Sequence, residues 1–246
     1  MTTGIILAGG RGTRLAPATN HTNKHMLLVY DREMIRYPAE TLVQAGITDL
    51  VVVLGPGGSA LVDVLEDGSW LKGLGLESLV YVHQGEPLGT AHSVQCAEQA
   101  VRTEDVVVIL GDSFFGGSLR HAYETWQENP HGALLITVMS DYPEKYGRVV
   151  TQKGYIWEIK EKVSGPPVPG EVSTGCCFLD NEIWGYLKGL DPSPRGELEF
   201  PDALQKYMVR NHLRAFQYDG FWTDMGTPEG VFDVALVMHN LPGKNG

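Results

Sequence analysis

Residues 4–14 read Gly-Ile-Ile-Leu-Ala-Gly-Gly-Arg-Gly-Thr-Arg, a short apolar run followed at once by a glycine-rich segment. The apolar run predicts a buried first strand, and the glycines predict a turn where this strand ends. Because glycine has no Cβ, three glycines in four positions let the backbone approach another molecule closely. Bare backbone N–H groups in such a loop suit phosphate oxygens, and Arg11 and Arg14 add positive charge. The stretch therefore predicts a phosphate-binding loop, with an ordinary turn between strand and helix as the alternative.

Strands and helices are expected to alternate up to residue 139. Apolar runs predict further strands at 49–54, 78–82, 105–110 and 133–139. Helical periodicity predicts helices at 36–45, 60–66, 90–101 and 119–127. Strands that are apolar almost throughout indicate a mostly parallel sheet with helices on both faces. Ligands of such sheets lie beyond the carboxyl ends of the strands, so 9–14, 84–90 and 111–113 are expected on one rim.

The character of the sequence changes after residue 140. Residues 141–146, 147–150 and 154–159 resemble short strands and turns without helices between them, which predicts an insertion in the wall of a pocket. A helix is expected to begin within 195–199 and to run to about residue 209, and a last helix is expected over 228–239.

Composition and charge exclude several classes of protein. With 43% hydrophobic and 20% charged residues, the 246-residue chain has the composition of a globular domain, and no run of eighteen apolar residues predicts a membrane span. The three cysteines lack the spacing of a metal site, which favours a reduced, cytoplasmic protein. A net charge of −11 argues against nucleic acid as a partner. A homo-oligomer is compatible with the sequence, which does not decide the oligomeric state.

From residue 7 onward the sequence resembles the sugar-1-phosphate nucleotidylyltransferases, most closely a short form of the glucose-1-phosphate thymidylyltransferases. The family pattern Leu-Ala-Gly-Gly-x-Gly-Thr-Arg-Leu-x-Pro-x-Thr matches residues 7–19, Lys24 follows, and 34–37 match Met-Ile-x-Tyr. The resemblance implies a Rossmann-like, mostly parallel sheet flanked by helices, with a small β-rich sugar-binding insertion. It implies a single nucleotidyltransferase domain over 1–246, with 1–140 mainly for the nucleotide and 141–227 mainly for the sugar phosphate.

The resemblance also implies where the nucleotide binds. Gln84 and Gly89 match family positions that contact the base, and an amide that both donates and accepts suits the imide edge of thymine or uracil. The other nucleotide contacts that it implies are Leu7, Gly9, Gly10, Gly12, Thr13 and Pro87. Without the resemblance, an exposed loop with no function is the simpler interpretation of Gln84. Residues 88–92 look equally like the uridylyltransferase branch, so the base stays open.

A pair of aspartates matches the metal ligands of the family. Asp112 follows an apolar strand, where a carboxylate is well placed to hold Mg²⁺ against phosphate oxygens; an Asp that caps a turn is the alternative. The second family ligand is matched by Asp224, within the stretch 222–227. The cofactor implied is Mg²⁺.

The reaction implied is attack of a sugar-1-phosphate oxygen on the α-phosphorus of a nucleoside triphosphate, with pyrophosphate leaving. The nucleophile is already an anion, so catalysis depends on bringing two anions together and neutralising their charge. The resemblance assigns this role to Arg14, Lys24 and Lys162. The sugar-binding positions that it implies are Tyr146, Gly147, Glu161, Thr174, Gly175 and Arg195. The alternatives are a solvated Glu161–Lys162 pair, core packing of Tyr146 and an ion pair of Arg195 with Glu199.

Three departures from the family pattern leave the substrate open. His25 stands where Gln is typical, and it either contacts the base or packs at the rim. Val163 replaces Pro, and Cys177 replaces an aromatic residue. Both of these positions are expected beside the sugar. The expected substrates are dTTP and glucose 1-phosphate, with UTP or another sugar phosphate as alternatives. A catalytically inactive sensor of nucleotide sugars is a further alternative, although Lys24 and both aspartates are present.

Overall fold

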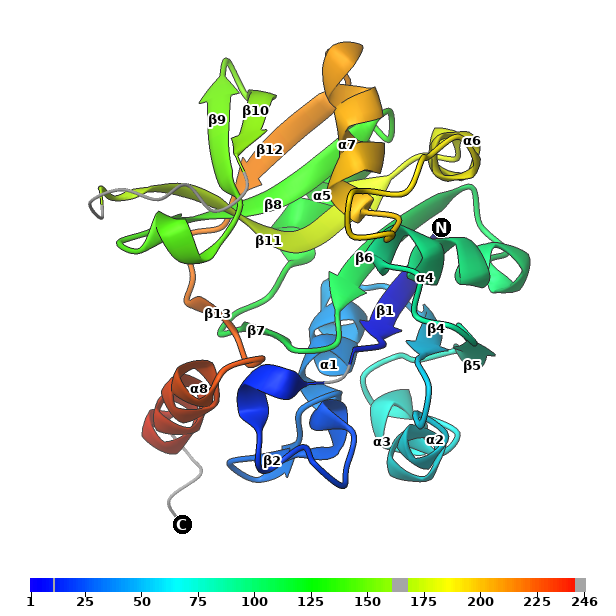
Figure 1. The fold of residues 1–246 in the computed structure, drawn as a ribbon, viewed down its shortest axis with the longest axis vertical. Coiled ribbons are helices and arrows are strands. Elements are labelled where there is room, and N and C mark those ends of the chain that lie inside the picture. Colours follow the sequence, from blue (N-terminus) through cyan, green and yellow to red (C-terminus); the bar gives the residue numbers. More distant parts are fainter. Residues whose placement is uncertain (11, 161–167, 242–246) are drawn as a thin grey trace.

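The computed structural model describes residues 1–10, 12–160 and 168–241. Within these residues, nine strands form one sheet in the order β5-β4-β1-β6-β11-β8-β12-β10-β9 (Figure 1). In chain order they are β1 (Thr2–Ala8), β4 (Asp49–Leu54), β5 (Ser78–His83), β6 (Asp105–Leu110), β8 (Ala133–Ser140), β9 (Arg148–Gln152), β10 (Tyr155–Lys160), β11 (Gly170–Leu179) and β12 (Leu213–Gln217). Two small sheets pair β2 (Leu28–Val29) with β3 (Arg32–Glu33) and β7 (Ser113–Phe115) with β13 (Trp222–Asp224).

The first strand lies at the centre of a parallel half-sheet. β1 pairs in parallel with β4 on one side and with β6 on the other, and β5 adds a parallel edge strand. All seven residues of β1 are buried, as expected for a strand that is covered on both faces. The carboxyl ends of these strands lie at one edge, which confirms the α/β sheet expected for this half of the chain.

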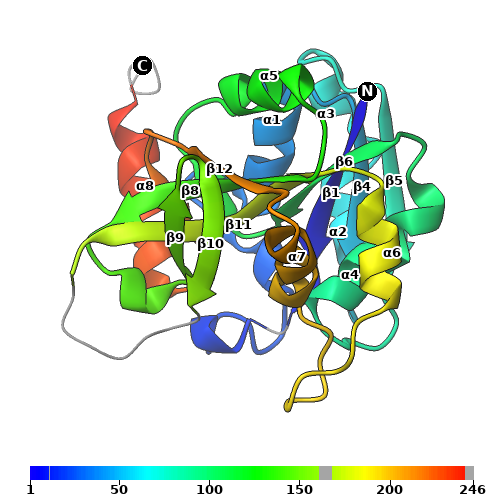
Figure 2. The same ribbon diagram turned by 90° about the horizontal axis from the view of Figure 1, so that it is seen from above.

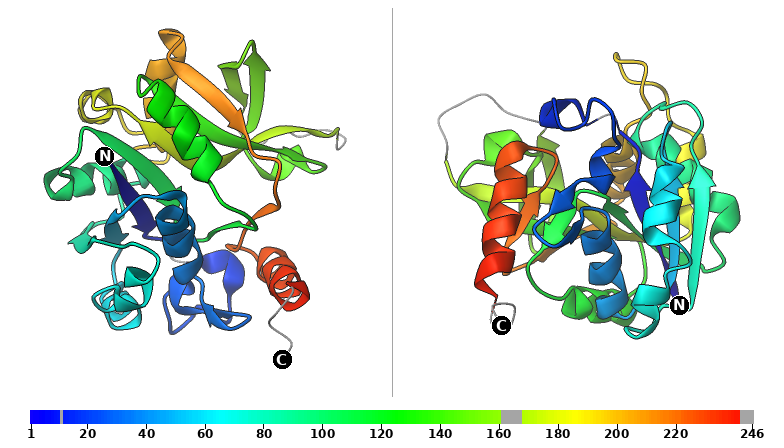
Figure 3. Two further views of the ribbon diagram at one scale, coloured as in Figure 1. Left: turned by 180° about the vertical axis from the view of Figure 1, so that it is seen from behind. Right: turned by 90° about the horizontal axis from the view of Figure 1, so that it is seen from below.

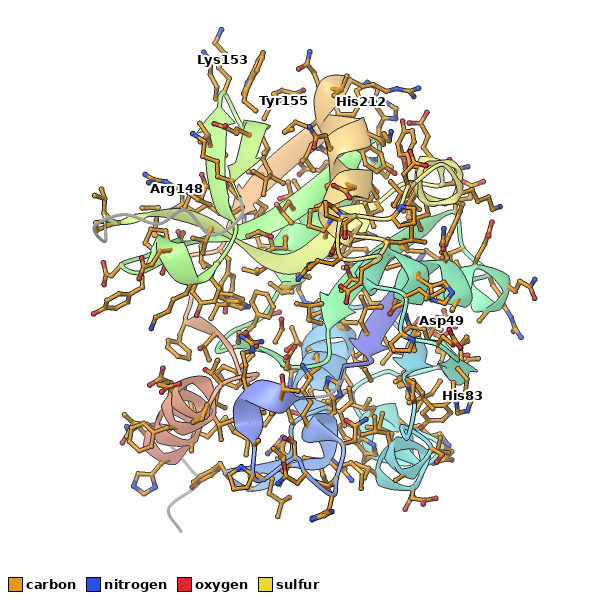
Figure 4. All side chains as sticks on the ribbon, viewed as in Figure 1. Asp49, His83, Arg148, Lys153, Tyr155 and His212 are labelled. Carbon is orange, nitrogen blue, oxygen red and sulfur yellow. The ribbon has the colours of Figure 1, made fainter. Side chains whose placement is uncertain are left out.

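The second half of the sheet is mixed. β11 runs antiparallel to both β6 and β8, whereas β12 is parallel to β8. The expected insertion forms the β9–β10 hairpin, which joins the same sheet through β12 and β11. Figure 4 shows the side chains of Lys153 and Tyr155 at the tip of this hairpin, pointing away from the sheet.

Helices cover both faces of the sheet. They are α1 (Arg36–Ala45), α2 (Ala60–Leu65), α3 (Ser69–Lys72), α4 (Thr90–Ala97), α5 (Arg120–Glu128), α6 (Glu182–Lys188), α7 (Phe200–Val209) and α8 (Pro228–Asn240). One core packs α1 and α5 against the sheet, and a second packs α4, α6 and α7 against the other face (Figure 2). Helix α8 stands apart from these layers beside the N-terminal segment and packs on β2 and β13 (Figure 3).

Some predicted boundaries are wrong. The helix expected to begin within 195–199 begins at Phe200, because Glu199 is still extended, with φ −94° and ψ 132°. The helix expected over 90–101 ends at Ala97 and continues as a 3₁₀ turn, η3 (Glu98–Ala100). The sequence did not predict β11, α6 or β12.

Candidate active site

Three neighbouring cavities open at the carboxyl edge of the parallel half-sheet. The glycine-loop cavity, of about 320 Å³, is lined by the glycine loop. The sheet cavity, of about 460 Å³, is lined by residues 173–175 of β11. The α8 cavity, of about 340 Å³, is lined by the first turns of α8. Arg14 and Asp224 line all three cavities. This arginine and this aspartate therefore stand where the cavities meet.

The glycine loop connects β1 to a short 3₁₀ turn, η1 (Thr13–Leu15). Gly10 and Gly12 adopt φ values of 103° and 63°, a region that residues with a Cβ rarely adopt. A Cβ on Gly12 would also lie 2.8 Å from Cβ of Lys24, so the loop can pack against this lysine only because residue 12 is glycine. Leu7, Gly9 and Gly10 line the glycine-loop cavity, whereas Gly12 and Thr13 are outside its lining in the described part of the chain. Arg11 is outside the described residues.

Lys24 packs against the glycine loop from the start of the 3₁₀ turn η2 (Lys24–Met26). Its ammonium group forms an ion pair with Asp112. The two side chains are only 12% and 8% exposed. Burial alone would raise the pKa of the Asp112 carboxyl, but the Lys24 charge and its hydrogen bond outweigh burial and hold that pKa below its usual value. The structure thus joins the predicted catalytic lysine to one of the predicted metal ligands.

The second predicted metal ligand lies close to the first. The antiparallel pairing of β13 with β7 places Asp224 opposite Ser113, and the Met225 N–H donates to the Asp112 carbonyl at 2.8 Å. Burial and the neighbouring Asp112 charge raise the pKa of Asp224, and Arg14 forms an ion pair with Asp224 at 3.4 Å. Two carboxylates held together in this way repel each other, which a cation placed between them would relieve.

Gly226 leaves room for that cation. A Cβ at this position would lie 2.7 Å from Asp224 Oδ1 and 2.8 Å from both Asp112 Oδ2 and Arg14 Nη2. No cluster of three or more acidic, His or Cys side chains that could hold a metal occurs among the described residues. Mg²⁺ bound with a nucleotide commonly takes only one or two protein carboxylates, plus waters and phosphate oxygens. The donor set therefore fits Mg²⁺ in the presence of a phosphate ligand.

His25 is fully buried beneath this cluster rather than in contact with a cavity. Its Nδ1 lies 2.9 Å from Asn23 Oδ1, and its Nε2 is buried without a partner among the described residues. Burial and the Lys24 charge lower the pKa of His25 from 6.5 to about 3, so the ring is neutral. Of the two interpretations offered by the sequence, packing holds and contact with the base does not.

The loop after β5 brings Gln84, Pro87 and Gly89 into the wall of the glycine-loop cavity. Gly89 has φ 110°, and a Cβ there would lie 2.3 Å from the Leu198 carbonyl oxygen. Residues 198–200 are hydrogen-bonded to this loop: Leu198 N–H donates to Leu88 O at 2.7 Å, and Ala91 N–H donates to Leu198 O at 2.9 Å. Glycine at position 89 permits this close approach.

All five predicted sugar-binding positions that the structure describes line the sheet cavity. Tyr146, Gly147, Thr174, Gly175 and Arg195 line it. The Thr174 hydroxyl donates to Ile136 O at 2.8 Å and accepts from Cys176 N–H, so it stabilises the irregularity in β11 between Ser173 and Cys177. Arg195 forms an ion pair with Glu199 at 2.7 Å, as the alternative interpretation expected.

Four further residues were expected beside the sugar phosphate. Glu161, Lys162 and Val163 lie outside the described residues. Cys177 was expected beside the sugar, but its side chain is 0% exposed and packs in the core with α7. Its neighbour Gly175, with φ 75°, turns the strand so that residues 173–175 face the cavity while Cys177 faces the core.

Several residues that line the cavities were missed. Ser93, Leu110 and Glu197 belong to the wall of the glycine-loop cavity, and Glu199 and Trp222 belong to the wall of the sheet cavity. Ser93 and Leu110 are close in sequence to expected rim segments, so the end of a strand and the start of a helix could have indicated them. Nothing local in the sequence indicates Glu197, because it reaches the cavity through the contact of residues 198–200 with the loop at Gly89.

A scan against protein families matches residues 3–240 to the model described as "Nucleotidyl transferase". The chain belongs to this nucleotidyl transferase family. Its curated relatives include glucose-1-phosphate thymidylyltransferase from Neisseria meningitidis, which is 36% identical over 97% of this chain and 83% of the relative. A low-salt glycan biosynthesis nucleotidyltransferase from Haloferax volcanii is 32% identical over 94% of this chain and 64% of the relative. The family expected from residues 7–37 is thereby confirmed.

Solved structures give the same result for the fold of this nucleotidyl transferase. A Bacillus anthracis crystal structure, assigned as a glucose-1-phosphate thymidylyltransferase and holding sucrose, matches with a TM-score of 0.88 at 34% identity, over 98% of this chain and 96% of that one. A UDP-glucose pyrophosphorylase bound to UDP-glucose matches with a TM-score of 0.83 at 23% identity, over 97% and 98%. The Rossmann-like fold class is confirmed. Among the described residues, no helix combines the length and the hydropathy that a membrane span requires.

Proposed function

We propose that this protein joins a nucleoside triphosphate, dTTP or UTP, to a sugar 1-phosphate, with glucose 1-phosphate as the first candidate, and releases pyrophosphate. The observation that carries the proposal is that two cavities share a wall. Leu7, Arg14, Thr90, Leu110 and Asp224 line both the glycine-loop cavity and the sheet cavity. Two substrates bound side by side would meet at this shared wall, next to the Lys24–Asp112 pair.

In this proposal the nucleotide occupies the glycine-loop cavity. The bare N–H groups of the glycine loop and the Arg14 guanidinium bind the β- and γ-phosphates, because both are donors aimed at an anion. Gln84 and Gly89 meet the base at the other end of the cavity. Lys24 binds the reacting phosphate oxygens and neutralises charge that develops in the transition state.

The sugar 1-phosphate occupies the sheet cavity. Tyr146, Gly147 and Gly175 bound the ring, and Lys162 and Arg195 are the candidates for its phosphate. Asp112 and Asp224 hold Mg²⁺, which when bound supplies positive charge to the phosphate oxygens of the nucleotide. The attacking phosphate oxygen is already anionic, so no residue is required to remove a proton.

A grid of pyrophosphate-release assays tests the proposal. We expect release, dependent on Mg²⁺, when dTTP or UTP is combined with glucose 1-phosphate and not with either substrate alone. Release with another sugar 1-phosphate only would keep the reaction and change the sugar. Binding of nucleotide sugars without any release across the grid would instead identify a sensor and overturn the proposed activity.

A further inference from the structure

The side-chain amide of Gln84 is fixed by two neighbouring acceptors. The side chain is buried, and its Nε2 lies 3.0 Å from the Gly89 carbonyl oxygen and 3.2 Å from Nδ1 of His92. A carbonyl oxygen can only accept a hydrogen bond, so the edge of the amide that faces Gly89 is the NH₂ group. The orientation of the amide thus follows from its surroundings.

His92 must accept the second N–H of this amide. Its Nδ1 therefore carries no proton, and the ring proton is on Nε2, which faces Cys96 Sγ at 3.8 Å. His92 and Cys96 are four residues apart in α4, on the same side of the helix. Hydrogen bonds thus run in order from Gln84 Nε2 to His92 Nδ1, and from His92 Nε2 to the Cys96 thiol.

The oxygen of the Gln84 amide is left for a ligand. Oε1 accepts no hydrogen bond from the described residues. Solvent can nevertheless reach this atom. Gly9 keeps the approach to it open, because a Cβ there would lie 3.0 Å from Oε1. Gln84 also lines the glycine-loop cavity. The cavity therefore presents an acceptor at this point.

We infer that His92 is a positioning residue that keeps the Gln84 oxygen toward the bound base and so selects a base that presents an N–H group there. Thymine and uracil carry such an N–H at N3, whereas cytosine carries a lone pair at N3. This inference rests on the proposed function, in that it places the base of a nucleotide in the glycine-loop cavity.

Cytosine would require the amide to turn over. The Gln84 oxygen would then face the Gly89 carbonyl, which can only accept, so one hydrogen bond would be replaced by repulsion. The other would be kept only if the His92 ring proton moved from Nε2 to Nδ1, which would take it away from Cys96. An unpaired buried polar group of this kind typically costs a factor of ten or more in affinity. His92 contributes to this discrimination without contact with the nucleotide.

Binding of dTTP, UTP and CTP measured by calorimetry tests the inference without requiring turnover. We expect wild-type protein to bind dTTP and UTP at least tenfold more tightly than CTP. The His92→Leu variant lacks one of the two acceptors and leaves the Gly89 carbonyl alone to hold the amide, so it should lose part of that ratio. His92→Asn supplies an amide oxygen near the position of Nδ1 and should keep the ratio within about threefold. A ratio in His92→Leu equal to that of the wild type overturns the inference.

A spectroscopic measurement on the wild-type protein covers the case in which His92→Leu does not fold. The ¹⁵N spectrum of the histidine ring distinguishes the two neutral forms. We expect the proton of His92 on Nε2 at neutral pH, and a proton on Nδ1 would overturn the inference.

The outcomes separate this inference from the proposed function. Base selection that His92→Leu reduces, without pyrophosphate release from any sugar 1-phosphate, would keep the inference and remove the proposed activity. Pyrophosphate release by a wild-type protein that does not distinguish dTTP and UTP from CTP would keep the activity and overturn the inference.

Discussion

Lys24 and Asp112 form a buried ion pair that connects the segment after the glycine loop to the end of β6. Each charge depends on the other, because removal of one partner leaves the other charged and buried. The same pair contains the residue that we expect to act on the reacting phosphate and one of the two expected metal ligands. Stability and catalysis therefore depend on the same contact.

Replacement of this lysine should affect both properties. We expect Lys24→Met to lower the turnover of pyrophosphate release by a factor on the order of 10² or more. We also expect it to lower the free energy of unfolding by roughly 3 kcal/mol, measured by urea titration without Mg²⁺. The matched control is Lys72→Met, which removes an exposed lysine from its ion pair with Asp67. That change should alter neither property appreciably, and equal effects of the two variants would contradict the role of Lys24.

A methyl group at Gly226 should impair metal binding. The added Cβ of Gly226→Ala would lie within 2.8 Å of both predicted metal ligands, so at least one carboxylate must move. We expect Mg²⁺ affinity in the presence of nucleotide to fall at least tenfold, measured by calorimetry. Gly73→Ala is the control, because a Cβ there meets no atom within 4 Å. Unchanged Mg²⁺ affinity in Gly226→Ala would argue against a metal site between Asp112 and Asp224.

His25 should make the protein sensitive to acid. In the folded protein the pKa of His25 is about 3, whereas in the unfolded chain it is near 6.5, so below pH 6.5 the unfolded chain binds a proton that the folded protein does not. The free energy of unfolding should therefore fall as the pH falls, by about 1.4 kcal/mol per pH unit in this window.

The His25→Gln variant removes this dependence. Gln is the residue that the family pattern leads us to expect at this position. We expect the difference in unfolding free energy between wild type and variant to change steadily between pH 6 and pH 4 in urea titrations. Parallel curves over that range would show that His25 is not held neutral.

Arg14 should matter for substrates and not for stability. Its side chain is 58% exposed, and its ion pair with Asp224 is long at 3.4 Å, so we expect a stability change within about 0.5 kcal/mol for Arg14→Gln. Because the guanidinium lines the cavity proposed for the triphosphate, we expect kcat/KM for the nucleotide to fall at least tenfold. Steady-state kinetics and thermal unfolding of the same preparation check both statements.

Local patterns predicted the half of the fold in which each strand is a continuous apolar run. β4 and β6 consist mostly of Val, Ile and Leu, and β1 contains the run Ile5-Ile6-Leu7. All three strands begin and end within two residues of the expected limits. β11 was missed because two glycines, Ser173 and Thr174 interrupt its apolar residues, and its extended form depends on the pairing with β6 and β8. Pairing of this kind is set by distant segments, which a local pattern does not contain.

The candidate site was predictable to the extent that it depends on strand ends. The rim rule brought together the glycine loop, the loop at Gly89 and Asp112, and the structure places all three on the glycine-loop cavity. The choice between the two interpretations of His25 and the cavity position of Glu197 were not predictable. Each depends on packing between segments that are far apart in the sequence.

The backbone contacts of residues 198–200 also have a consequence for attempts to change specificity. Phe200 N–H donates to Thr90 Oγ1 at 3.0 Å across 110 positions of sequence, beside the two hydrogen bonds between Leu198 and the loop at Gly89. A loop transplanted from a relative with another base preference would have to offer the Leu88 carbonyl, the Ala91 N–H and a hydroxyl at position 90 to this partner. Segments 84–92 and 193–200 should therefore be exchanged together in chimeras, because either one alone would leave its counterpart with unpaired backbone groups.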